Sequence, residues 1–378
     1  MRHYLGLLTQ PTGAIRETFY SIDILRGLAA ISILVFHYTH FTMGNGALAI
    51  APERLDTVPI LRDLGWLRAN GALAVQLFWT ISGFVFMNVY AGEAVGARTF
   101  FVNRLARLYP LHLLTLLIVA AVQAVSMGRF GPFLIYPDNS AAEFVRHLFF
   151  ASAWWDAQRL SFNGPVWSVS VEILIYLAFW AYVRVTRPSL LTAGVLAGVF
   201  LLLSAATQNL IFLCGAFFFA GAAGYACFVL TPVRSRGMLA VFWGLVLIVW
   251  TLALLSGRID RLPLTIRLVG LFVPALLLLA SGELMGLQPF FKRLRTVGDI
   301  TYSTYMWHTP LQMLFLLGAG FGLYPVTIAL GGGFFLAYLL VVIAFAYTSY
   351  RMIERPAQAA VRARFLHTRK PRTIISAP

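Results

Sequence analysis

The chain has 378 residues, of which 60% are hydrophobic and only 11% are charged, and its mean hydropathy is +0.79. Soluble domains carry about 25% charged residues, so this composition excludes an ordinary soluble protein and predicts a polytopic α-helical membrane protein. The formal net charge of +15 does not indicate a nucleic-acid partner in this setting. Basic cytoplasmic loops that face anionic lipids and anionic ligands explain the charge better.

Ten hydrophobic runs have the length of about 20 residues that crosses a hydrocarbon layer of about 30 Å. They cover residues 22–41, 71–90, 106–126, 166–183, 190–206, 209–230, 238–256, 264–282, 300–318 and 325–348. We therefore predict about ten transmembrane helices, with a short turn over Ala206–Asn209 separating the fifth run from the sixth. The predicted domains are an N-terminal segment (1–21), a ten-span domain (22–350) and a basic tail (351–378).

The distribution of basic residues predicts the orientation of the spans. If the N-terminus is cytoplasmic, the outer segments carry nine arginines and seven acidic residues, whereas the inner loops and the tail are strongly basic. Positive charge accumulates on the cytoplasmic side, so both termini are predicted to be cytoplasmic. The first 20 residues lack the pattern of a cleavable signal peptide. We expect a multi-pass protein of the cell inner (plasma) membrane.

Two of the outer connections, 42–70 and 127–165, are long enough to have a function or a structure of their own. The second is rich in aromatic residues and is predicted to hold a short surface helix. The two cysteines, Cys214 and Cys227, have no metal or disulfide spacing and are interpreted as packing residues.

The first predicted span carries ionisable residues that are costly inside a membrane. Arg26 and His37 are eleven residues apart, which corresponds to about 16 Å and about three turns of helix, so they point to similar faces. Each such group costs roughly 2.5–3.5 kcal/mol on insertion, so both are candidates for function. The alternative is a packing histidine and an arginine that extends to the membrane surface.

Other predicted spans carry polar groups that match this pair in depth. Arg104 and Arg107 share a helical face at the cytoplasmic end of the third span, where they either bind a phosphate or simply anchor the helix. Glu172 in the fourth span lies at the predicted depth of His37, so it either orients the imidazole or joins two helices. No paired spacing of metal ligands occurs on one helix, so no metal is expected.

The ninth predicted span contains Tyr302, Ser303, Tyr305 and His308, and the histidine falls near the middle of the membrane. In the second span, Ser82-Gly83 is interpreted as a site of close helix packing rather than chemistry. His40 and His112 lie near the ends of spans and are interpreted as interfacial residues.

These residues lie in stretches that resemble the acyltransferase family 3 integral-membrane enzymes, which O-acylate cell-surface carbohydrates and some small molecules. The resemblance covers residues 20–356 and rests on six motifs in order: IDILRGLAAISILVFHY, FWTISGF, FVNRLARLYP, NGPVWSVSVEILIY, ITYSTYMWHTPL and Glu354-Arg355-Pro356. It implies a membrane O-acyltransferase that uses acyl-CoA, usually acetyl-CoA, as co-substrate. The implied acceptor is a carbohydrate, such as a polysaccharide of the cell envelope, or a small hydroxylated molecule.

The resemblance also implies roles for individual residues. His37 corresponds to the essential histidine, and Arg26, Arg104 and Arg107 to arginines that bind the donor. The other implied catalytic residues are Glu172, Tyr302, Ser303 and His308. In the resulting hypothesis, His37 is the general base and Glu172 orients it, while Tyr302, Ser303 or His308 stabilises the oxyanion or positions the acceptor. Direct transfer and a route through an acylated histidine both remain open.

Two other classes of function fit parts of the pattern. A transporter of a sugar lipid or of a proton-coupled solute also uses membrane histidines and glutamates, although the chain shows no internal repeat and no matched pair of broken helices. A scaffold subunit does not need charged groups at matched depths. The acceptor, the acyl chain length and the oligomeric state do not follow from the sequence.

Overall fold

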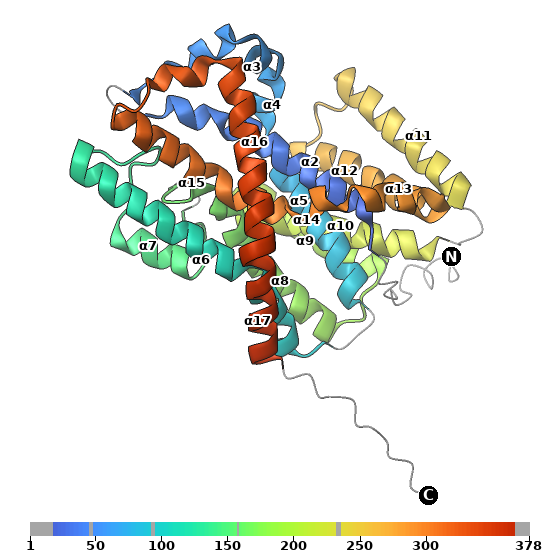
Figure 1. The fold of residues 1–378 in the computed structure, drawn as a ribbon. Coiled ribbons are helices and arrows are strands. Elements are labelled where there is room, and N and C mark those ends of the chain that lie inside the picture. The colour runs from blue at the N-terminus through green and yellow to red at the C-terminus, as the bar shows by residue number, and fades with distance from the viewer. Residues whose placement is uncertain (1–17, 45–47, 92–94, 157–158, 232–235, 367–378) are drawn as a thin grey trace, which may run out of the picture.

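The computed structural model describes residues 18–44, 48–91, 95–156, 159–231 and 236–366, and all regular structure within these ranges is helical (Figure 1). The predicted all-α class is therefore confirmed. Within the same ranges, nine helical segments are long and apolar enough to cross a membrane. The predicted ninth span is also a helix, but its polar residues leave it outside this set. The number of spans, their orientation and the domain boundaries stay predictions.

Ten long helices form the body of the described part of the chain. They are α2 (Tyr20–His37), α5 (Leu73–Tyr90), α6 (Ala97–Phe130), α8 (Trp167–Val185), α9 (Leu190–Thr207), α10 (Leu210–Leu230), α11 (Arg236–Leu255), α12 (Leu264–Gly282), α15 (Thr301–Gly320) and α16 (Gly332–Ser349). Shorter helical segments connect them: η1 (Tyr38–Thr42), η3 (Pro52–Thr57), α3 (Pro59–Asp63), α4 (Gly65–Asn70), α7 (Ala141–Leu148), η4 (Gly164–Val166), η6 (Glu283–Leu287), α13 (Gln288–Arg293), α14 (Arg295–Asp299), η7 (Val326–Leu330), η8 (Tyr350–Glu354) and α17 (Arg355–Phe365).

The turn predicted between the fifth and sixth spans is present. Gln208 ends α9 in a left-handed conformation with φ of 55°, and Asn209 caps α10 by accepting a hydrogen bond from the backbone N–H of Ile211 at 2.8 Å. An asparagine at this position satisfies a backbone donor that the first turn of a helix leaves free. A short interval with three polar residues, Thr207, Gln208 and Asn209, is thus enough to reverse the chain between two apolar helices.

Helices with similar composition occupy different places in the molecule. α10 is apolar on all sides and packs between α9 and α5, so most of its residues are buried. α11 is equally apolar but packs mainly against α12 and lies at the edge of the molecule (Figure 1). An apolar surface of this kind suits contact with lipid. α2 packs against α5, α14 and α15, and this central position makes it the scaffold of the site.

The third and last predicted spans extend further than the sequence indicated. α6 has 34 residues, which corresponds to about 51 Å of helix, longer than a hydrocarbon layer of about 30 Å. α16, η8 and α17 continue one another from Gly332 to Phe365 and form a column across the face of the molecule (Figure 1). The boundary that we predicted at residue 351 lies inside this column. α17 packs against α6 rather than leaving the protein as a free tail.

Candidate active site

A cluster of three histidines lies where α2 meets α15. His37 is the last residue of α2, and the tight turn of η1 brings His40 back beside it, with His37 Nδ1 2.9 Å from His40 Nε2. The ring of His308 from α15 stacks on His37, with 5.0 Å between ring centroids and an angle of 29°. The structure therefore brings together His37 and His308, two of the predicted site residues.

Two further polar residues surround this cluster. His40 Nδ1 lies 2.9 Å from Gln312 Oε1, and the Gln312 side-chain amide donates to the backbone carbonyl of His37 at 2.8 Å. The Tyr136 hydroxyl lies 3.1 Å from His40 Nε2. The η1 turn folds the side chain of His40 inward, where it is only 2% exposed. Its position near the membrane interface stays a prediction.

A separate cavity of about 110 Å³ lies among α2, α5, α6, α8 and α15. Its polar lining includes arginine side chains as well as hydroxyl groups. The lining residues that carry polar side chains are Arg26, Trp79, Ser82, Arg107, Ser168, Glu172, Tyr176, Thr301, Tyr302 and Tyr305. Sequence reasoning missed Ser168 and Tyr176, although Tyr176 follows Glu172 by one helical turn.

Glu172 belongs to this cavity and not to the histidine cluster. Its side chain lies beside Ser82 and Tyr176 and within electrostatic range of Arg26 and Arg104, while its Oε1 is buried without a hydrogen-bond partner among the described residues. The partner that His37 Nδ1 contacts is His40. The predicted pairing of Glu172 with His37 is therefore not found, because Glu172 shares the cavity with Arg26, which lies about 16 Å from His37 along α2.

Arg26 is held by close packing between α2 and α14. Its guanidinium pairs with Asp23 at 2.9 Å and donates to the Gly298 carbonyl at 3.4 Å. Glycine is required at this contact, since a Cβ on Gly298 would lie 2.5 Å from Cβ of Asp23. The contact fixes the arginine at the cavity wall while leaving it charged.

The two arginines of α6 have different surroundings. Arg107 lines the cavity, whereas the guanidinium of Arg104 lies 4.7 Å above the ring of Phe86 and donates to the Tyr90 hydroxyl at 3.3 Å. Arg104 is absent from the cavity lining in the described part of the chain. The fork of two guanidiniums that we predicted is therefore replaced by a pair formed by Arg26 and Arg107 from two helices.

Tyr302 and Ser303 at the start of α15 donate hydrogen bonds to a backbone carbonyl and to a carboxylate, respectively. The Tyr302 hydroxyl donates to the Leu108 carbonyl at 2.7 Å. The Ser303 hydroxyl donates to Glu354 Oε2 at 2.7 Å, and Gln358 donates to the other oxygen of that carboxylate at 3.0 Å. Ser303 thus holds the C-terminal column against α15. Because its hydroxyl is bonded to Glu354, its side chain is not part of the cavity lining described above.

Tyr305 connects the cavity with the histidine cluster. Its hydroxyl lines the cavity, where it donates to the Pro165 carbonyl and lies 2.7 Å from Ser168 Oγ. Its backbone carbonyl lies 2.6 Å from His308 Nδ1, so this nitrogen carries a proton and donates. One residue therefore belongs to both parts of the candidate site.

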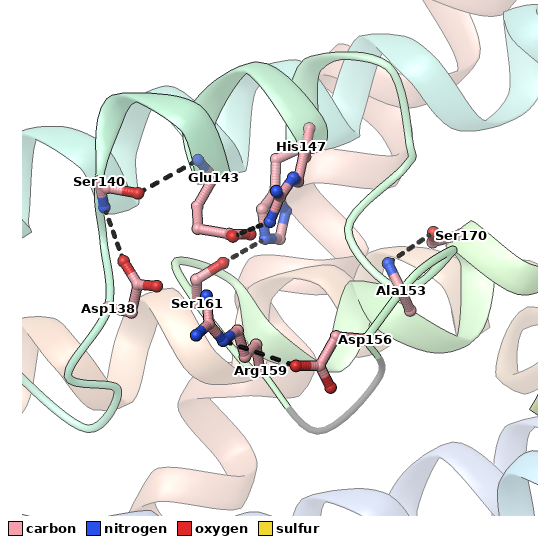
Figure 2. A network of polar contacts seen from close by, with 10 residues as sticks. Asp138, Ser140, Glu143, His147, Ala153, Asp156, Arg159, Ser161 and Ser170 are labelled. Atoms are coloured by element: carbon pink, nitrogen blue, oxygen red, sulfur yellow. Dashed lines mark hydrogen bonds and ion pairs between the residues drawn. The ribbon is translucent and has the colours of Figure 1, made fainter.

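The long connection between α6 and α8 contains the short helix that we predicted, α7. Ser140 caps it, and its side chains Glu143 and His147 face Ser161 across the loop (Figure 2). His147 Nε2 lies 3.0 Å from Ser161 Oγ, and His112 Nε2 donates to the His147 carbonyl at 2.8 Å. His112 is fully buried in the protein, while its position near the membrane interface stays a prediction.

Protonation of His147 is expected to loosen this loop. Burial, followed by the proximity of His112, lowers the pKa of His147 to about 3, whereas an unfolded histidine titrates near 6.5. The open loop therefore binds a proton that the docked loop does not, and docking weakens as the pH falls from about 6.5 toward 3. The loss amounts to about 1.4 kcal/mol per pH unit.

Hydrogen exchange of α7 at pH 7 and pH 5 measures this loss of docking free energy. His147→Gln, which keeps a partner for Ser161, should remove the pH dependence. An equal dependence in His147→Gln contradicts the assignment to His147.

The described residues contain no group of three or more His, Cys, Asp or Glu that could hold a metal ion. Cys214 and Cys227 are both unpaired thiols, and Cys214 is buried.

Comparison with known proteins gives one family match and two relatives. Residues 19–351 match the family described as "Acyltransferase domain". The chain is 36% identical over 120 residues to the acyltransferase MdmB of Streptomyces mycarofaciens, in an alignment that covers 31% of this chain and 30% of that protein. It is 28% identical over 208 residues to Protein 2 in the picA locus of Rhizobium radiobacter, covering 50% of this chain and 96% of that protein. No solved structure matches.

Proposed function

The chain belongs to the acyltransferase domain family, and from this premise we propose that it moves an acyl group, namely acetyl, from cytoplasmic acyl-CoA to a hydroxyl group. The acceptor is a carbohydrate of the cell envelope or a small hydroxylated molecule, and the membrane is the inner (plasma) membrane. The observation that carries this proposal is the arrangement of two arginines around a small cavity that Tyr305 connects to the His37–His308 pair.

The basic end of the cavity suits the phosphates of the donor. Arg26 and Arg107 present guanidinium groups from two different helices, and guanidinium groups bind phosphate through charged, paired hydrogen bonds. A cavity of about 110 Å³ accommodates a slender chain but no nucleotide, so the nucleotide stays at the cytoplasmic mouth and the pantetheine arm enters. The 11 residues from Arg26 to His37 correspond to about 16 Å of helix, within reach of that arm.

The histidine cluster suits proton transfer to and from the acceptor. His37 takes the proton of the acceptor hydroxyl as its oxygen attacks the thioester carbonyl, and returns the proton to the sulfur as the carbon–sulfur bond breaks. The products are the ester and free CoA. Among the other residues in the initial hypothesis, His308 stacks directly on the base, while Tyr302 and Glu172 line the donor cavity. We therefore assign the two latter residues to donor positioning.

Labelled acetyl-CoA tests the activity. Membranes that contain the protein are incubated with acetyl-CoA labelled in the acetyl group, and the label is followed into lipid, polysaccharide and small-molecule fractions while release of free CoA is measured. We expect both to exceed the values of membranes without the protein. Movement of solute without CoA turnover would instead support the transporter alternative.

The donor site makes a separate prediction. Arg107→Ala should raise the KM for acetyl-CoA by about tenfold, because loss of a charged hydrogen bond costs roughly 1.5–3 kcal/mol. Arg104→Ala is the matched control on the same helix, since its guanidinium packs on Phe86 outside the cavity lining. We expect a smaller change in KM for the control, and the difference should shrink at high salt. Equal effects of the two variants would remove Arg107 from the donor site.

A further inference from the structure

The hydrogen bonds around the histidine cluster have a fixed direction. A backbone carbonyl only accepts, so the Gln312 group that contacts the His37 carbonyl at 2.8 Å is its NH2. The Gln312 oxygen therefore faces His40 Nδ1 at 2.9 Å, and since this oxygen only accepts, His40 Nδ1 carries the proton.

The direction continues from His40 to His37. In neutral His40 the other nitrogen, Nε2, then holds a lone pair and accepts hydrogen bonds. It lies 2.9 Å from His37 Nδ1 and 3.1 Å from the Tyr136 hydroxyl, and both of these groups can donate to it. His37 therefore carries its proton on Nδ1. Its lone pair is on Nε2, the nitrogen for which no hydrogen bond is found among the described residues.

From this chain of contacts we infer that His40 and Gln312 are positioning residues that hold His37 in the tautomer whose Nε2 accepts a proton. This inference rests on the proposed function, in which His37 is the base. The two residues do for His37 what a buried carboxylate does in a serine–histidine–aspartate site, namely fix the tautomer and the ring orientation. A neutral imidazole and an amide do so without placing a further charge in the membrane, where an ionised carboxylate is costly.

The surroundings support a fixed ring. Gln312 and His308 are fully buried, and Gln312 holds the backbone of His37 as well as the side chain of His40. His308 donates from Nδ1 to the Tyr305 carbonyl, so the nitrogen that it presents to its surroundings is also an unprotonated Nε2. The stacked ring of His308 limits rotation of His37 without competing for its Nδ1 proton.

Two substitutions of His40 separate positioning from packing. A glutamine places its terminal amide near the position of Nε2 and retains an acceptor for His37 Nδ1–H, whereas the shorter asparagine does not reach it. We expect His40→Gln to keep kcat for label transfer from acetyl-CoA within about fivefold of the original protein. His40→Asn should lower kcat by about 100-fold, with the KM for acetyl-CoA unchanged in both, since loss of an orienting partner costs about that much. Equal kcat values in the two variants, or a change confined to KM, would overturn the inference.

A spectroscopic measurement tests the tautomer directly and does not depend on turnover. The chain contains only seven histidines, so ¹⁵N-histidine labelling of the full-length protein in detergent gives a spectrum that single substitutions can assign. We expect His37 to show a protonated Nδ1 and an unprotonated Nε2, and Gln312→Leu to reduce this population while Gln312→Glu, which retains an acceptor for His40, preserves it. A protonated Nε2 in the original protein would refute the inference. The expected tautomer in a protein that transfers no label would instead refute the proposed function alone.

Discussion

His37→Ala is expected to abolish acyl transfer while leaving a folded protein in the membrane. A positioned general base contributes about 10²–10⁴-fold to the rate, so label transfer from acetyl-CoA should fall at least 100-fold. The substitution removes the ring that contacts His40 and His308, but the backbone carbonyl of His37 still accepts from Gln312. The α2 helix therefore keeps its hydrogen bond to α15.

The control for this experiment is His37→Gln. Glutamine can still bond to His40 and fill much of the space of the imidazole, but its amide cannot take up a proton at neutral pH. We expect this variant to elute from size exclusion at the volume of the original protein and to be as inactive as His37→Ala. Substantial activity in either folded variant would remove His37 from the role of base and leave the proposed mechanism without its central residue.

Several features of the fold follow from the order of residues along the chain. The interval Ala206–Asn209 predicts the turn before α10, because its three consecutive polar residues between two apolar runs are costly inside a membrane. The first hydrophobic run predicts a helix over residues 22–41, and the structure has α2 over Tyr20–His37, continued by η1 to Thr42. These features are local, so hydrophobic length and turn residues determine them.

The arrangement of the site was predicted less well, because the ends of a hydrophobic run do not fix which residues of two helices meet. The sequence predicts Glu172 at the depth of His37, yet in the structure Glu172 shares a cavity with Arg26, which lies about 16 Å from His37 along α2. Gln312 follows His308 by one helical turn on the same face, so its spacing did offer a signal that we did not use. Tyr136 could not be identified from sequence spacing, because it lies in an irregular loop in which Ile135 has a φ of 61°.

The C-terminal region shows how composition alone misleads. The stretch from residue 351 is basic, which favours a tail on the membrane surface. Glu354 within it is 1% exposed and bonded to Ser303 and Gln358, so one buried carboxylate ties the helix to the core. The bonds of Glu354 hold the start of α17 against α15, and only tertiary contacts reveal these partners.

Gly83→Ala is expected to impair folding rather than the chemical step of the reaction. α5 and α10 cross so closely that a Cβ on Gly83 would lie 1.7 Å from the Phe218 carbonyl oxygen, whereas real Cβ contacts do not fall below 3.0 Å. The obstacle is backbone, which cannot rotate away, so the two helices must separate. Overpacking of this kind costs typically 1–3 kcal/mol and more where backbone is involved, so we expect about 3 kcal/mol or more. The loss should appear as a lower thermal unfolding midpoint and as aggregation on size exclusion.

The same crossing supplies a second variant and α9 supplies the control. Gly221 faces α5 from the other side, with its Cβ position 1.9 Å from the Thr80 carbonyl oxygen, so Gly221→Ala should have a similar effect. Gly198 is also helical, but nothing lies within 4 Å of its Cβ position. Gly198→Ala should therefore be neutral, or stabilising by about 0.5–1 kcal/mol, because alanine favours the helix.

If Gly83→Ala unfolds at the same temperature as Gly198→Ala, the close crossing is not what holds α5 and α10 together. Ser82, the residue next to Gly83, lines the donor cavity, so a stable Gly83→Ala protein should still show an altered KM for acetyl-CoA.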